Sequence, residues 1–79
     1  MPCVNTILSE AREICEMRNE GGELMVKNIN KLCSKHFADL PEKKADVLWY
    51  FYHSARLRLF HTTLDIELFL NQLQEIVQA

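Results

Sequence analysis

The sequence predicts an all-α fold, a compact bundle of four helices formed by a single domain that spans residues 1–79. Two observations lead to this fold class. In four successive segments, apolar residues recur at alternating spacings of three and four, as they do on the buried side of a helix. The chain also holds only two glycines and two prolines; Gly21 and Gly22 fall between the first two segments, and Pro41 begins the third. Short connections of this kind place consecutive helices as antiparallel neighbours.

The first helix is predicted over residues 4–19 and the second over residues 23–37. Asn5 and Thr6 are start signals for the first helix, because their side chains can accept hydrogen bonds from free backbone N–H groups. Its predicted end is the Gly21–Gly22 pair, since glycine tolerates the left-handed conformation that closes helices. The second helix carries its own apolar stripe, which consists of Val26, Ile29, Leu32, Cys33 and either His36 or Phe37.

The third helix is predicted over residues 41–60 and is the longest of the four. Pro41 suits the first turn of a helix, and Glu42 meets the positive end of the helix dipole. Six apolar or aromatic residues follow one another from Val47 to Tyr52, a composition that also favours strands. A helix is the preferred interpretation, because no hairpin turn lies nearby and the flanking helical pattern continues through the run.

The fourth helix is predicted over residues 63–78. Thr62 and Asp65 form a variant of the capping box, in which two side chains close the start of a helix reciprocally. An alternative stays open for residues 61–63, where the third and fourth helices meet. If these residues are themselves helical, the two helices form one long rod.

Composition narrows the class of partner. Nine basic and eleven acidic residues give a formal net charge of −2, whereas nucleic-acid binders usually show a basic surplus or stripe. We therefore expect a protein partner, no nucleic acid and no membrane, since no uncharged apolar stretch is long enough to span a bilayer. Three cysteines without a secretion signal predict free thiols in the reducing cytoplasm.

The residue types that carry chemistry do not form a catalytic or metal-binding pattern. Cys33 and His36 lie one helical turn apart, but there is no second closely spaced ligand pair, and Cys15 falls on an expected core stripe. His53 and His61 lie on one side of the third helix with Leu57 between them, where a metal site would need a second histidine. We expect no enzyme activity, no cofactor and no metal, since so small a bundle offers little concave surface.

The aromatic cluster of the third helix is the strongest functional signal. Trp, Tyr and Arg are enriched in the energetic hot spots of protein interfaces. In a small bundle each helix leaves part of its surface exposed to solvent. Apolar residues on every side of one helix therefore suggest that a partner protein covers the exposed part. The predicted interface consists of Trp49, Tyr50, Tyr52, His53, Arg56 and Phe60. The function predicted from it is that of an adaptor, chaperone-like protein or regulator, which we expect to homodimerise. The alternative is that the third helix is the central helix of a monomeric bundle, contacted by all three others, and that these side chains form its far wall.

A second function stays open as an alternative: a transcriptional or nucleoid regulator that contacts nucleic acid through Lys43, Lys44, Arg56 and Arg58. The segment Phe51–Leu59 is similar to an aromatic–tyrosine–serine–alanine run on the long helix of the Hha-type nucleoid modulators. That likeness is confined to this segment and assigns no family. Arg56 and Arg58 project from different sides of a helix, which counts against a shared nucleic-acid surface.

Overall fold

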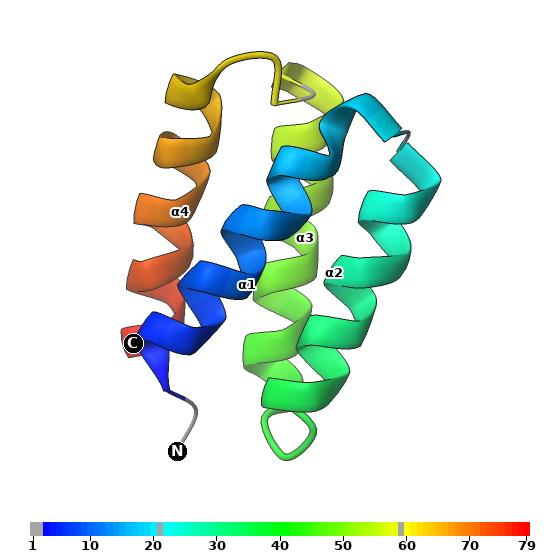
Figure 1. Cartoon of the computed structure of the whole chain (residues 1–79). Coiled ribbons are helices and arrows are strands. Elements are labelled where there is room, and N and C mark those ends of the chain that lie inside the picture. The colour runs from blue at the N-terminus through cyan, green and yellow to red at the C-terminus, as the bar shows by residue number, and fades with distance from the viewer. Residues whose placement is uncertain (1–2, 21, 59) are drawn as a thin grey trace.

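The computed structural model describes residues 3–20, 22–58 and 60–79, without the side chains of residues 18–19 and 55–58. The described residues form four α-helices and one short 3₁₀ helix, with no strand among them. Their bounds are α1 Val4–Glu16, η1 Met17–Glu20, α2 Gly22–His36, α3 Pro41–Arg58 and α4 Thr63–Gln78. Figure 1 shows the helices running alternately up and down, with both chain ends at the same end of the bundle. The all-α four-helix bundle predicted from the sequence is confirmed.

The helices are arranged so that each one packs against two others. α1 contacts α2 and α4, and α3 contacts the same two helices, which places α1 and α3 on opposite sides of the core. The Cα radius of gyration is 11.4 Å, close to the ~11.6 Å expected for a compact chain of this length. α3 therefore has one side toward the core and one side toward solvent, and it is not a central helix surrounded by the others.

The core is a single cluster of buried side chains to which all four helices contribute. Its largest completely buried members are Phe37, Phe51, Phe60, Phe69, Ile7, Ile29 and Leu73. Two of the three cysteines, Cys15 and Cys33, are buried in it as small apolar groups, as expected from their positions on the helical stripes.

The first predicted helix ends earlier than its apolar pattern suggested. α1 stops at Glu16, and the chain continues as η1 to Glu20. The tighter 3₁₀ form is common at helix ends, where it provides partners for the last carbonyl groups. The backbone of Cys3, and not of Asn5 or Thr6, precedes the first turn, and its carbonyl accepts a hydrogen bond from the Ile7 N–H at 3.0 Å. Of the predicted Gly21–Gly22 cap, Gly21 lies outside the described residues, and Gly22 is the first residue of α2.

The turn between α2 and α3 is short and begins with the buried Phe37. The Leu40 N–H donates to the Phe37 carbonyl at 3.0 Å, and the Leu40 carbonyl then accepts from the Lys44 N–H at 3.0 Å. Pro41 occupies the first position of α3, as predicted, where its missing N–H leaves no intrahelical bond unmade.

The break between α3 and α4 is real, so the alternative of one long helical rod is wrong. The Asp65 N–H donates to Thr62 Oγ1 and the Thr62 N–H donates to Asp65 Oδ2, both at 3.1 Å, which completes the predicted capping box. Phe60 has φ of 51°, a left-handed conformation that a helix cannot continue through. The two features together turn the chain back on itself.

Charged side chains link the helices around the rim of the bundle. Arg12 of α1 pairs with Glu67 of α4. Glu10 of α1 accepts from Lys35 Nζ at 2.8 Å and lies 2.7 Å from His36 Nε2, both on α2. The hydrogen bonds from Lys35 and then His36 hold the pKa of Glu10 below its ordinary value. Glu10 thus gives His36 a partner within the chain, and the ion pairs align α1 with its neighbours. The hydrophobic cluster provides most of the stabilisation of the fold.

Candidate interaction surface

The structure divides the six-residue apolar run of α3 between core and solvent. Val47 and Phe51 are completely buried, and Leu48 and Tyr50 are half-buried against the core. Trp49 and Tyr52 are exposed, with 65% and 43% of their surface accessible. The run therefore follows ordinary helical geometry, in which two of six neighbouring positions point away from the bundle.

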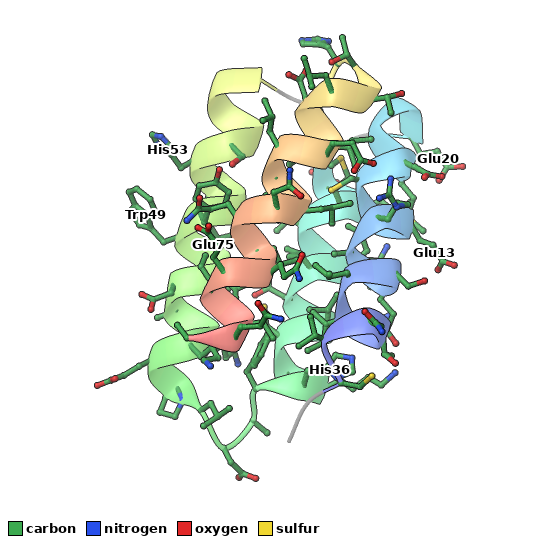
Figure 2. All side chains as sticks on the ribbon, turned by 90° about the vertical axis from the view of Figure 1, so that its left-hand side faces the viewer. Glu13, Glu20, His36, Trp49, His53 and Glu75 are labelled. Carbon is green, nitrogen blue, oxygen red and sulfur yellow. The ribbon has the colours of Figure 1, made fainter. Side chains whose placement is uncertain are left out.

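Trp49 is the most exposed aromatic residue described on α3, and it is held against His53. The two rings are stacked, with centroids 4.9 Å apart and an interplanar angle of 9°. Figure 2 shows both side chains projecting from α3 away from the other helices. Together with Tyr52 they form the outer face of α3, defined as Trp49, Tyr52 and His53. Stacking restricts the indole to one orientation, so a partner would meet a partly ordered aromatic surface.

Tyr52 lies at the side of this face that is nearer to α2. Its hydroxyl accepts a hydrogen bond from Asn30 Nδ2 of α2 at 3.1 Å, and the same amide donates to the Val26 carbonyl at 2.8 Å. The bond fixes the ring at the border between α2 and α3. Arg56, the predicted neighbour of Tyr52 in the interface, has a side chain outside the described part of the structure.

Two of the six predicted interface residues pack against the core instead of facing solvent: Tyr50 on α3, and Phe60 in the turn that follows α3. Tyr50 is half-buried, and its ring stacks on Phe69 of α4 with centroids 5.6 Å apart. Phe60 is 0% exposed and lies 5.8 Å from Phe51 and 5.3 Å from Phe69, measured between ring centroids. The expectation that Phe60 contributes to an exposed interface is therefore corrected, because the left-handed turn at this residue places its ring in the core.

A groove of about 590 Å³ runs between α3 and α4 beside Trp49. Trp49, Tyr50 and Ile76 supply its apolar surface. Its charged lining consists of Glu42, Lys43, Asp46 and Glu75, and Gln72 and Ala79 complete it. We refer to this feature as the α3–α4 groove. Further along α4, Leu64 and Leu68 are exposed at 65% and 48% and extend the apolar surface toward the other end of the bundle.

The acidic lining of this groove was not among the features predicted from the sequence. Glu42, Asp46 and Trp49 follow one another at the spacing of one helix side, and this signal was present in the sequence. Glu75 comes from α4, and only the packing of α3 against α4 brings it to the same groove.

The lysines expected to contact phosphates in the alternative function have partners within the chain. Lys43 Nζ donates to the carbonyls of Val77 and Ala79 at 2.8 Å each, at the negative end of the α4 dipole. Lys44 Nζ is 3.4 Å from Ser34 Oγ on α2. The side chains of Arg56 and Arg58 lie outside the described part of the structure. No observation on the described residues favours a nucleic-acid surface.

The candidate metal ligands are dispersed. Cys15 and Cys33 lie in the core, Cys3 is exposed near the start of α1, and His36 contacts Glu10. Among the described residues, no three Cys, His, Asp or Glu side chains come together in a group suited to a metal ion. Burial raises the pKa of the Cys33 thiol to about 11, which keeps it protonated and unreactive at neutral pH.

Thiol modification under native conditions is expected to label Cys3 and to spare Cys15 and Cys33. Cys3 is exposed, and the hydrogen bond with the Thr6 side chain lowers its pKa, whereas the other two thiols are inaccessible. Mass spectrometry after a brief maleimide treatment should show one adduct per chain in buffer and three in denaturant. Rapid native labelling of Cys33 would contradict the packing of α2 against the core.

No protein-family model, curated protein or solved structure matches this chain. Within the described part of the chain, each helix is too short or too polar to cross a lipid bilayer. The functional conclusion therefore depends on the surface of the bundle itself.

Proposed function

We propose that this chain is a small cytoplasmic interaction module, an adaptor or regulator that binds another protein through the outer face of α3. The observation that carries the proposal is Trp49, a tryptophan with 65% of its surface exposed. Tryptophan is among the residues most enriched in interface hot spots, because a partner can remove a large apolar area from water at one position. Cys3, Cys15 and Cys33 form no disulfide, which is compatible with a reducing compartment.

The surroundings of Trp49 also suit a protein partner. Tyr52 and His53 present polar atoms beside the indole, and Leu68 of α4, which lines a pocket together with His53, adds apolar surface. Interfaces combine such an apolar centre with a polar rim. A second copy of the chain is one partner that could use this face, and homodimerisation belongs to the same proposal.

Replacing Trp49 by alanine is expected to weaken partner binding strongly while leaving the fold intact. Trp49 faces solvent, so its loss should change the free energy of unfolding by less than about 1 kcal/mol, whereas removal of a hot-spot tryptophan typically weakens binding by 2 kcal/mol or more, about thirtyfold. The measurement is affinity capture of the tagged chain from its native cells with quantitative mass spectrometry, together with sedimentation velocity of the purified protein.

Leu40→Ala provides the matched control, because Leu40 is also apolar and 40% exposed but lies in the α2–α3 turn. The proposal requires a captured protein, or a self-association, that is retained by Leu40→Ala and strongly reduced in Trp49→Ala. A strictly monomeric protein whose captured proteins are the same for both variants would contradict it.

A further inference from the structure

The α3–α4 groove combines an apolar floor with carboxylates that form no ion pair with the basic side chains that the structure describes. Glu42, Asp46 and Glu75 line the groove, and none of them pairs with a described basic side chain. Lys43, the basic residue of the lining, directs its ammonium group to the Val77 and Ala79 carbonyls. The negative charge of the groove is therefore available to a ligand.

The same groove offers surfaces that suit the side chains of a cationic peptide. Trp49 presents an exposed ring, and the face of an indole attracts lysine and arginine side chains. Tyr50 and Ile76 are only half-buried and form an apolar floor between the two helices. From Glu42 to Trp49 the groove follows α3 for about 10 Å, which corresponds to two turns of a bound helix.

We propose that the α3–α4 groove binds a cationic amphipathic segment of another protein, with its Lys or Arg side chains opposite Glu42, Asp46 and Glu75. Apolar side chains of the segment lie on Tyr50 and Ile76, beside Trp49. This inference rests on the proposed function, because it names the chemistry of the partner that the outer face of α3 binds. Docking of a helix in such a groove is a common mode of peptide recognition.

Charge also distinguishes this occupant from a second copy of the chain. A two-fold dimer through the groove would oppose the same surface from both copies, so that the acidic lining of one copy would face the acidic lining of the other. Like charges that face one another across an interface are unfavourable. A basic segment removes this repulsion and gains attraction instead.

The test uses a pair of designed peptides and the single tryptophan of the chain as reporter. One peptide is an amphipathic helix of leucine and lysine with about four turns, and the other carries glutamate in place of every lysine. Binding is followed by Trp49 emission and confirmed by calorimetry at near-physiological salt. The wild-type chain is expected to bind the lysine peptide and to ignore the glutamate peptide.

Two double variants with the same change in charge identify the site. Asp46→Asn/Glu75→Gln removes two carboxylates from the groove, and Glu20→Gln/Glu23→Gln removes two exposed carboxylates near the η1–α2 junction. We expect the first pair to weaken binding of the lysine peptide about tenfold and the second pair to change it less than about twofold, since distant exposed charges are screened. Equal losses in both variants, or equal binding of the two peptides, would overturn the inference.

Two further outcomes separate this inference from the proposed function. If the lysine peptide does not bind while Trp49→Ala still weakens native capture strongly, the cationic partner is wrong and the interface on α3 stands. If sedimentation shows a wild-type dimer that Asp46→Asn/Glu75→Gln strengthens, the occupant is a second copy, and the inference is overturned. If neither peptide binding nor Trp49-dependent association is found, both proposals fail.

Discussion

Replacing Phe60 by alanine is expected to lower the free energy of unfolding by about 3–5 kcal/mol. The ring is 0% exposed and contacts Phe51 and Phe69, so its removal leaves a cavity where α3 and α4 meet. A domain of this size has a total stability of roughly 4–12 kcal/mol, and the variant should therefore be partly unfolded at physiological temperature. Urea denaturation followed by circular dichroism measures the loss.

Two further substitutions at this position separate the stability that comes from the buried ring from the cost of the left-handed backbone conformation. Phe60→Leu keeps most of the apolar volume and should cost less than Phe60→Ala. Phe60→Gly removes the side chain completely but relieves the left-handed φ of 51°, so it should be at least as stable as Phe60→Ala. Phe60→Gly would be the less stable of the two if this residue had ordinary helical geometry, since glycine disfavours helix interiors.

Phe60 also shows where prediction from the sequence reaches its limit. The residue follows Trp49 by about three helical turns, so a helix that continued through residue 60 would expose both on the same side. α3 ends at Arg58, and the left-handed turn directs Phe60 inward. The four helices and the Thr62–Asp65 cap were predictable because periodicity and capping are local signals. The direction of a side chain in a turn depends on how the next helix packs.

The predicted interface residues also divide into those whose exposure follows from the sequence and those whose burial depends on tertiary packing. The exposure of Trp49 and Tyr52 follows from the helical period once Val47 and Phe51 are assigned to the core. Tyr50 could not be placed from the sequence, because its half-burial depends on Phe69 of α4. The acidic groove needed the pairing of α3 with α4, which brings Glu75 beside Asp46.

Aspartate at position 47 is expected to unfold the protein, whereas aspartate at position 49 is expected to leave it folded. Val47 is 0% exposed, so Val47→Asp buries a carboxylate without a partner and loses the contacts of an apolar side chain. The combined cost is at least about 4 kcal/mol, comparable with the entire stability of a marginal domain of this size. Trp49 is 65% exposed, and the cost of Trp49→Asp should stay below about 1 kcal/mol, mostly from helix propensity and from repulsion by Asp46.

This pair of variants also distinguishes the two interpretations of the apolar run. In a central helix surrounded by its neighbours, both positions would be buried and both aspartates would unfold the chain. In the bundle described here, α3 packs against α2 and α4 and leaves the side of Trp49 in water. Thermal denaturation of the two variants at neutral pH is the measurement, with Tyr52→Asp as a second exposed position. A folded Val47→Asp, or an unfolded Trp49→Asp, would place α3 in a different rotation about its axis and remove the basis for an interface at Trp49.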